Sequence, residues 1–226
     1  MASTDPLADA AIEPVRAGMV VGLGTGRAAA RAIDALGRHA AAHDIPIHCV
    51  ATSETSARRA SALGLRVLPA EDIPSIDYLF DGADEVDPSM RMIKGRGGAM
   101  TREKIVARSS LRRVYLVQRS KLVDRLGVSA PLPVEVLRIG MAATAAALER
   151  LGLRGGRREA PDGSPVLTDD GNPILDVELP GGLDLAALAS SLDEIPGVVG
   201  HGLFLTEADA LVIEADERGP IERRER

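Results

Sequence analysis

The feature that most constrains the fold is a repeated change from apolar, β-rich runs to helical patterns. It is clearest in MVVGLGTGRAAARAIDALG, residues 19–37, where an apolar run leads through a glycine turn into an alanine-rich stretch. Helical patterns cover residues 27–42 and 55–63, and they alternate with short apolar runs up to about residue 125. The runs are MVVGL, IPIHCVA, LRVLP, IDYLF and RVYLVQ. This alternation predicts an α/β fold with a mostly parallel sheet covered by helices.

A second order of elements begins at Pro131. The predicted strands are PLPVEVL, SPVLT, PILDVEL and GVVGHGLFL, and the predicted helices are GMAATAAALERLG and LAALASSLDEI. The resulting βαββαβ order is that of a ferredoxin-like unit. Asp170-Gly171-Asn172 predicts a hairpin turn, whereas the charged, glycine-rich GLRGGRREAPDG predicts a loop. We expect ALVIEA to return to the first sheet and the tail DERGPIERRER to be solvated.

Composition excludes several classes of partner. The chain of 226 residues carries 27 basic and 33 acidic side chains, a balance that argues against a surface built to follow nucleic-acid phosphates. No apolar stretch approaches the roughly 18 residues of a membrane span. Cys49, the single cysteine, excludes an intrachain disulfide and fits a reducing compartment. We therefore expect a soluble cytoplasmic protein whose ligands are small molecules and not nucleic acid or membrane.

The glycine turn in the first stretch is a candidate anion site. Gly22, Gly24 and Gly26 lie between an apolar run and a helix, where backbone N–H groups and the helix dipole favour negative charge. A dinucleotide fingerprint needs a third glycine where Arg27 stands, and the lysine of a nucleotide P-loop is also missing. The turn therefore fits a single phosphate better than a dinucleotide, although a tight turn without a ligand is the plain alternative. Thr25 and Arg27 favour the phosphate, because a hydroxyl and a guanidinium can both bind it.

Four acids follow the run IDYLF. Asp81 is expected just past the carboxyl end of a strand, where open α/β sheets bind ligands, and Asp84, Glu85 and Asp87 come soon after. Acids this close repel one another unless a cation or a polyol compensates them, and a solvated acidic loop is the alternative. The four histidines are scattered, and none has the spacing of a metal ligand. We therefore expect no metal.

The segment MIKGRGGAMTREKIV carries groups suited to proton transfer. Lys94 opens a glycine-rich loop, and Thr101 is a predicted N-cap for a helix with Glu103 in its first turn. An acid at that place usually only complements the helix dipole. A carboxylate together with an ammonium group, however, suits a site where an oxyanion develops. Lys121 follows another strand, and by itself it predicts a surface lysine.

The motifs GLGTG, DGADEVD, KGRGGAMTREKIVA, SKLVDRLG, PLPVEV, TDDGNPILDV and GVVGHGLF occur in this order over nearly the whole chain. This series resembles ribose-5-phosphate isomerase of the A type. The resemblance implies a Rossmann-like catalytic domain, which we assign to residues 1–129 and 205–226, and a smaller ferredoxin-like domain, which we assign to residues 130–204. It also implies interconversion of D-ribose 5-phosphate and D-ribulose 5-phosphate in the non-oxidative pentose phosphate pathway. It implies no metal or organic cofactor, and a homodimer or homotetramer.

The resemblance also implies roles for individual residues. Glu103 matches the base that moves a proton between C2 and C1 of the sugar through an enediolate, and Lys94 matches the lysine beside the reacting oxygens. Asp81 and Asp84 match the acids that bind sugar hydroxyls and help to open the ring, which would explain the acidic cluster. Ser53 and Thr55 lie in ATSETS, near where the family keeps another hydroxyl-rich loop. The implied substrate-binding set is Thr25, Gly26, Arg27, Ala28, Gly82, Ala83, Gly95, Arg96, Gly97 and Lys121.

The chain departs from the family pattern at several of these places. Arg27 and Ala28 stand where serine and threonine are usual, Arg96 stands for a glycine, and Gln118 stands for an aspartate. Either Arg27 replaces the lost hydroxyl contacts to phosphate, which is the simpler interpretation, or the arginines adapt the pocket to a related sugar phosphate.

Two further function classes remain as alternatives. The first is a sugar-phosphate-sensing module that binds the ligand without isomerising it. About 17 residues precede the first predicted strand, too few for a helix-turn-helix, and the set of two aspartates, Lys94 and Glu103 also argues against a sensor. The second is a nucleotide-dependent oxidoreductase, which the missing third glycine disfavours.

Overall fold

The computed structural model of the chain describes residues 5–69, 71, 75–215 and 218–226. It divides into two compact units. The first comprises Met1–Ala83, Arg102–Lys121 and Glu207–Arg226, and the second comprises Asp84–Thr101 and Leu122–Thr206.

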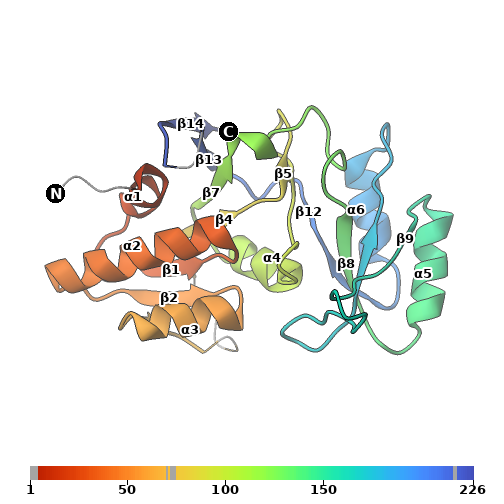
Figure 1. Cartoon of the computed structure of the whole chain (residues 1–226), viewed down its shortest axis with the longest axis horizontal. Coiled ribbons are helices and arrows are strands. Elements are labelled where there is room, and N and C mark those ends of the chain that lie inside the picture. The colour runs from red at the N-terminus through yellow and green to blue at the C-terminus, as the bar shows by residue number, and fades with distance from the viewer. Residues whose placement is uncertain (1–4, 70, 72–74, 216–217) are drawn as a thin grey trace. The chain divides into compact units, whose positions relative to one another are not determined.

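The first unit contains a seven-stranded sheet with the order β14-β13-β7-β4-β1-β2-β3 (Figure 1). All neighbouring strands in it are parallel except β13 and β14. Its strands are β1 (Val20–Leu23), β2 (His48–Ala51), β3 (Arg66–Val67), β4 (Tyr78–Gly82), β7 (Arg113–Gln118), β13 (Ala210–Glu214) and β14 (Ile221–Glu225). The predicted mostly parallel sheet and the return of ALVIEA to it are therefore confirmed.

The charged tail was expected to be solvated, and no strand was predicted in it. Residues 221–225 form β14, which pairs with β13 at the edge of the sheet, while Asp216 and Glu217 of the tail lie outside the described residues. The last three side chains of β14 are exposed, as is usual for a charged edge strand that discourages further pairing.

Helices cover the two faces of this sheet. They are α1 (Pro6–Ile12), α2 (Arg27–His43), α3 (Glu54–Ala62) and α4 (Met100–Arg108), with a 3-10 turn at Arg119–Lys121. Val21 and Phe80 pack in one core cluster with Leu36 of α2. On the opposite face, a Cβ at Gly22 would lie 3.2 Å from Cγ1 of Val106 on α4. Because strand residues alternate between faces, the residues of β4 and β7 at positions 81 and 115 lie on the α4 face.

The second unit contains a four-stranded antiparallel sheet with the order β11-β8-β10-β9. Its elements are β8 (Leu132–Val136), α5 (Met141–Arg150), β9 (Gly155–Arg157), β10 (Ile174–Val177), α6 (Leu185–Asp193) and β11 (Val198–His201). The βαββαβ order of a ferredoxin-like unit is therefore present. Gly171 has φ of +79° and its N–H donates to the Thr168 carbonyl at 2.9 Å, which confirms the predicted turn.

The second strand of this unit was predicted in the wrong segment. SPVLT makes only isolated bridges, through Pro165 and Leu167, whereas the glycine-rich segment predicted to be a loop contains β9. A Cβ at Gly155 would overlap the carbonyl oxygen of Asp176. The glycine that suggests a loop is therefore what allows β9 to approach β10 closely.

A small antiparallel sheet with the order β12-β6-β5 also belongs to the second unit. Its strands are β5 (Glu85–Val86), β6 (Met92–Ile93) and β12 (Leu203–Phe204). Because β6 pairs with β12, residues 84–101 group with this unit, whereas the sequence had suggested that they belong to the first domain. Residues 122–129 were also assigned to the first domain from the sequence, and they also group with the second unit.

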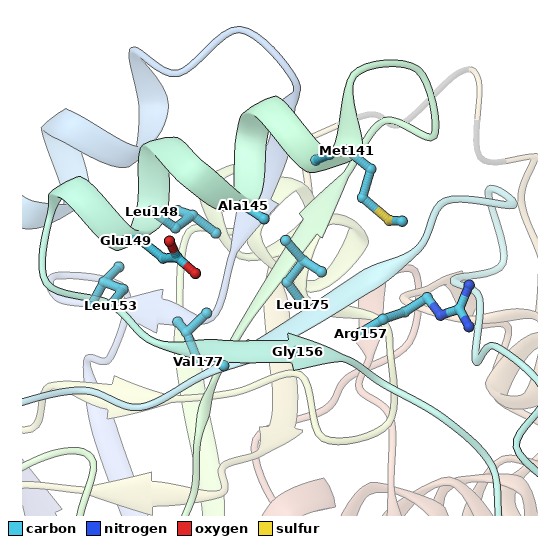
Figure 2. A pocket seen from close by; sticks show the side chains of 11 residues that line it. Met141, Ala145, Leu148, Glu149, Leu153, Gly156, Arg157, Leu175 and Val177 are labelled. Carbon is cyan, nitrogen blue, oxygen red and sulfur yellow. The ribbon is translucent and has the colours of Figure 1, made fainter.

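A cavity of about 200 Å³ lies between α5 and the strands β9 and β10. Figure 2 shows Leu148 of α5 facing Leu175 and Val177 of β10 across it. Glu149 and Arg157 add polar groups to this otherwise apolar lining. None of the predicted site residues lines the cavity.

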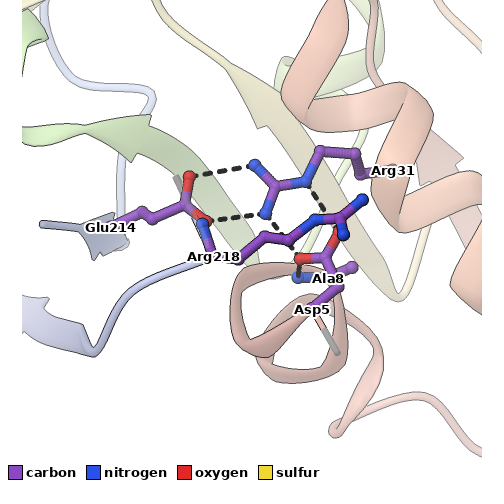
Figure 3. Close-up of polar contacts among 5 residues, drawn as sticks. All are labelled: Asp5, Ala8, Arg31, Glu214 and Arg218. Carbon is purple, nitrogen blue, oxygen red and sulfur yellow. Dashed lines mark hydrogen bonds and ion pairs between the residues drawn. The ribbon is translucent and has the colours of Figure 1, made fainter. Parts of the chain in front are cut away.

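Arg31 ties three elements of the first unit together. Its guanidinium donates to Asp5 at 2.7 and 2.6 Å and to Glu214 at 2.9 and 2.6 Å, as Figure 3 shows. Asp5 also caps α1 by accepting from the N–H of Ala8, and Glu214 accepts from the N–H of Arg218 at 2.7 Å. The Glu214 side chain is fully buried, so this network joins α1, α2 and β13 in a partly desolvated place.

Replacing Arg31 by methionine is expected to lower the free energy of unfolding by about 3 kcal/mol at pH 7, because two carboxylates lose their shared partner. Hydrogen bonding to Arg31 holds the pKa of Asp5 and of Glu214 below their ordinary values of 3.8 and 4.5. Groups with lowered pKa values stabilise the fold above their unfolded pKa, and this contribution disappears as the pH falls. The difference between wild type and variant should therefore shrink below about pH 4.5.

Urea unfolding measured across this pH range tests the prediction. The matched control is Arg58→Met, which removes an exposed ion pair with Glu54 and should cost less than about 0.5 kcal/mol. Equal losses in the two variants, or a loss for Arg31→Met that does not change with pH, would contradict a stabilising role for the network.

Candidate active site

The glycine turn after β1 is held against Asp81. The N–H of Gly24 donates to the carbonyl of Phe80 at 2.9 Å, and a Cβ at Gly24 would overlap the Asp81 carboxylate. The N–H groups of Thr25 and Gly82 donate to Oδ1 of Asp81 at 3.0 and 2.7 Å. Glycine at position 24 is therefore required by the close approach of the turn to this acid.

Asp81 lies inside β4, not just past its end as the sequence suggested. The strand extends two residues beyond the apolar run IDYLF, because Asp81 and Gly82 still pair with β7. The Asp81 side chain is fully buried and faces the side of the sheet covered by α4. A buried carboxylate at the carboxyl end of a central strand is well placed to accept hydrogen bonds from a polar ligand.

Hydroxyl groups surround the same turn. Oγ1 of Thr25 lies 2.7 Å from Oγ1 of Thr52 and 2.8 Å from Oγ of Ser53, and Ser56 donates to the carbonyl of Gly24 at 2.7 Å. ATSETS therefore does bring hydroxyls to the glycine turn. Thr52 and Ser56, which the sequence analysis did not single out, are part of this network, and Ser53 also caps α3.

The first residues of α2 leave backbone N–H groups available at its positive end. Gly26 has φ of +100° and occupies the N-cap without a side-chain hydrogen bond. Arg27 is the exposed first residue of the helix, and Ala28 packs against the core cluster on that face. Together with Thr25, this helix end can bind an anion through backbone amides, a hydroxyl and a guanidinium.

Glu103 and Asp81 both lie near one buried tyrosine, Tyr115. Glu103 is 4% exposed and stands one turn before Val106, on the side of α4 that packs on the sheet. Tyr115 is the strand partner of Asp81 in the pairing of β4 with β7, and it is fully buried. Burial raises the pKa of Tyr115 well above its ordinary value of 10, and the charges of Asp81, Glu103 and Glu207 raise it further. A neutral phenol therefore sits among three carboxylates.

Neither Tyr115 nor Glu207 was found by the sequence analysis. Tyr115 belongs to the apolar run RVYLVQ, where a tyrosine indicates only a core position. Glu207 is buried shortly before β13 and forms an ion pair with the exposed Arg108 at 3.5 Å. Their closeness to the predicted acids depends on strand pairing across the sheet, for which the local sequence carries no signal.

Lys94 is enclosed within the second unit. It is 2% exposed, its Nζ lies 5.5 Å from the centroid of the Phe204 ring, and its N–H donates to the carbonyl of Gly202 at 2.9 Å. The contact with the ring is a cation–π interaction, which holds the ammonium group in place. A buried ammonium group in a fixed position is suited to stabilise negative charge on a ligand.

The loop after Lys94 needs some of its glycines and not others. Gly95 has φ of +102°, and a Cβ there would lie 2.7 Å from Cβ of Met100. Gly98 has φ of +80° and its N–H donates to the carbonyl of Gly95 at 2.9 Å. Arg96, which replaces a glycine of the family pattern, has no positive φ and is exposed, so the backbone accommodates it without strain.

The acidic cluster separates into two kinds of residue. Glu85 accepts the N–H groups of Gly127 and Ala130 at 2.6 and 2.8 Å, and Asp87 binds the Arg91 guanidinium at 2.6 Å. These two acids hold loops of the second unit, so a ligand is not needed to explain them. Asp84 is half-buried, and its Oδ2 accepts the N–H of Arg96 at 2.9 Å, which ties it to the glycine loop.

The prediction that Thr101 is the N-cap of α4 was wrong. The helix begins at Met100, and Oγ1 of Thr101 donates to the carboxylate of Glu135 on β8. Glu135 also accepts from Thr168 at 2.8 Å and from Asn172 at 2.9 Å. The threonine hydroxyl thus serves the interior of the second unit and not the helix end. Lys121, the other predicted lysine, is half-buried at the end of the 3-10 turn.

Metal and thiol chemistry find no support among the described residues. No group of three or more His, Cys, Asp and Glu side chains there could hold a metal ion. Burial raises the pKa of the Cys49 thiol to about 12, which keeps it protonated and unreactive. Within the same part of the chain, no helix has both the length and the apolar character that a membrane crossing needs.

The sequence resembles known proteins over most of its length. A sequence model of the family ribose 5-phosphate isomerase A (phosphoriboisomerase A) matches residues 48–218. Ribose-5-phosphate isomerase A of Roseiflexus sp. is 44% identical over 207 residues, which cover 91% of this chain and 89% of that protein. The protein of the same name from Methylorubrum extorquens is 44% identical over 216 residues, covering 93% of this chain and 91% of its own.

Solved structures lead to the same group of proteins. Ribose 5-phosphate isomerase A from Methanocaldococcus jannaschii superposes with a TM-score of 0.90 at 33% identity, covering 97% of this chain and 96% of that one. A D-ribose-5-phosphate isomerase in complex with phospho-erythronic acid gives a TM-score of 0.91 at 34% identity with the same coverage. These matches span both units described above. The chain therefore belongs to the ribose-5-phosphate isomerase A family.

Proposed function

We propose that this chain interconverts D-ribose 5-phosphate and D-ribulose 5-phosphate through an enediolate, with Glu103 as the base. Membership of the isomerase family supports the reaction and its sugar phosphate substrate. The observation that carries the mechanism is the burial of Glu103 beside Tyr115, on the sheet face that Asp81 shares. One buried carboxylate can take the proton from C2 and return it to C1, because it exchanges little with solvent between the two steps.

Lys94 is proposed to stabilise the oxygens of the enediolate. As the proton leaves C2, negative charge develops on the neighbouring oxygens, and a fixed cation lowers the energy of that state more than the energy of the substrate. The enclosure of Lys94 against Phe204 supports this role, since the ammonium group needs little reorganisation during the reaction.

The two aspartates are proposed to bind the sugar hydroxyls and to help open its ring. Asp81 is held by the N–H groups of Thr25 and Gly82, and Asp84 is held by the N–H of Arg96. These bonds orient each carboxylate, so that it can accept a hydroxyl hydrogen. Gly82 and Ala83, which lie between the two acids in the chain, complete this part of the proposed substrate contact.

The glycine turn and the start of α2 are proposed to bind the phosphate. Thr25 supplies a hydroxyl, and Gly26, Arg27 and Ala28 supply the amides and the guanidinium of the helix end. Lys121 is proposed to add a second cation to the substrate site, and Gly95, Arg96 and Gly97 to supply backbone contacts from the glycine loop. Neither a metal nor an organic cofactor is needed in this scheme.

Replacing Arg27 by alanine is expected to raise the KM for ribose 5-phosphate about tenfold with little change in kcat, because a charge-assisted contact to phosphate contributes on the order of 1.5 kcal/mol. Steady-state kinetics on the variant measure both KM and kcat. Arg38→Ala, which removes an exposed arginine later on α2, is the control and should leave KM unchanged. An unchanged KM for Arg27→Ala would show that Arg27 does not replace the missing hydroxyls.

A direct assay of the purified protein tests the proposed function. We expect turnover of ribose 5-phosphate to ribulose 5-phosphate, unchanged by a chelator, and much slower turnover of other pentose and tetrose phosphates. Binding without turnover would instead indicate a sensing module, and preference for another sugar phosphate would mean that the arginines had changed the specificity. Light scattering of the same sample tests the homodimer or homotetramer that we propose for the cytoplasmic enzyme.

A further inference from the structure

Arg158 binds the glycine loop and an aspartate at the same time. Its side chain is 14% exposed, and Nε and Nη2 donate to the two carboxylate oxygens of Asp176 at 2.7 and 2.6 Å. Its third nitrogen, Nη1, donates to the carbonyls of Gly95 and Arg96 at 3.1 and 2.9 Å. One guanidinium therefore connects β10 to two successive peptide groups of the loop that follows Lys94.

These two bonds determine how the loop presents its amides. In a trans peptide the carbonyl and the N–H of the next residue point in opposite directions, and the described residues contain no cis peptide. Because the carbonyls of Gly95 and Arg96 point to the guanidinium, the N–H groups of Arg96 and Gly97 point away from it. The first of these N–H groups meets Oδ2 of Asp84 at 2.9 Å. The guanidinium therefore orients the loop edge that lies beside Asp84.

We propose that Arg158, held by Asp176, is a positioning residue for the isomerase reaction, which fixes the glycine loop so that its amides, Asp84 and Lys94 meet the sugar in the correct geometry. This inference rests on the proposed function. Arg158 does not touch the substrate in this scheme, and it acts only through the loop.

The chemistry of the side chain explains why arginine occupies this place. A guanidinium has five N–H donors in a rigid fork, so it can bind a carboxylate with one edge and carbonyls with the other. A lysine ammonium at this position could reach one of these partners but could not hold both in a fixed plane. Asp176 is itself fixed, because β10 pairs on both sides, with β8 and with β9.

The neighbouring residue provides a matched control. Arg157 is exposed and pairs with the exposed Glu159 at 2.8 Å, so its removal leaves the glycine loop untouched. Arg158→Ala is expected to lower kcat for ribose 5-phosphate about 30-fold to 100-fold, since a displacement of about 1 Å can cost this much in rate. Arg158→Lys should recover only a small part, and Arg157→Ala should keep wild-type kinetics.

Two measurements separate positioning from a general loss of structure. Millimolar methylguanidinium should restore part of the activity of Arg158→Ala and none of that of Arg158→Lys, because only the alanine leaves space for it. Amide hydrogen exchange should become faster at residues 96–98 in Arg158→Ala while β8 and β10 keep their protection.

Wild-type kinetics in Arg158→Ala, or an activity loss that matches the unfolded fraction, would overturn the proposal. Failure of the proposed function would look different, because the wild type itself would then not isomerise ribose 5-phosphate. In that case the exchange experiment still shows whether Arg158 orders the glycine loop. Unchanged exchange at residues 96–98 would show that Arg158 does not order it.

Discussion

The Glu103→Gln variant should fold, bind ribose 5-phosphate and lose on the order of 10³-fold in kcat, because the amide cannot accept the proton from C2. Glutamine has nearly the same size and shape as glutamate, so the packing of α4 on the sheet should persist. The first turn of α4 loses a favourable negative charge, at a cost of less than about 1 kcal/mol in stability. Steady-state and single-turnover kinetics measure the loss, and solvent deuterium incorporation at C2 shows whether proton removal is the step affected.

Glu207→Gln is the matched control. Glu207 is also a buried glutamate whose charge acts on Tyr115, but we assign it no step in the reaction. It should keep kcat within a few fold of the wild type. If the two variants lost activity equally, the loss would come from the change in buried charge around Tyr115. A wild-type rate in Glu103→Gln would show that another group is the base.

The elements predicted most accurately from the sequence are those with a clear apolar pattern. RVYLVQ was expected to be a strand and forms β7 over the same six residues. The helical pattern of residues 27–42 corresponds to α2, which ends one residue later at His43. In α2 the apolar residues recur at helical spacing and face one core, whereas in β7 four successive residues are buried because both faces of the sheet are covered. The βαββαβ order of the second unit was also predicted, although its second strand was placed in SPVLT and lies instead in β9.

The elements missed were short or had misleading composition. β5 and β6 have two residues each, too few for any period to appear. The predicted strand GVVGHGLFL forms two strands, β11 and the two-residue β12. β9 contains two glycines, which indicate a loop unless the close approach of β10 is known. By contrast, α1 could have been found, because Asp5 at its N-cap and Pro6 at its first position are a local signal for a helix start.

Some residues of the candidate site could likewise be found from the sequence, and others could not. Gly24, Gly26 and Gly95 stand out in the sequence because a turn, a positive φ or a close contact requires them. Tyr115 and Arg158 do not, because the sequence around each indicates only a buried strand or a charged loop. Tyr115 pairs with Asp81, 34 positions away in the chain, and Arg158 contacts Arg96 and Gly95, which are 62 and 63 positions away. A single sequence does not reveal such pairs.

The Lys94→Met variant should lose about 100-fold in kcat, because removing one preorganised partner of a developing oxyanion costs on the order of 3 kcal/mol. Methionine keeps the apolar stem against Phe204, so the loss should reflect the charge and not the packing. The KM for ribose 5-phosphate should change much less than kcat, because the ammonium group acts mainly on the charge that develops during the reaction. Lys104→Met removes a lysine of α4 with no assigned role and should remain fully active. If Lys94→Met kept the kcat of the wild type, the enediolate would have to be stabilised by another group, for which Lys121 would be the next candidate.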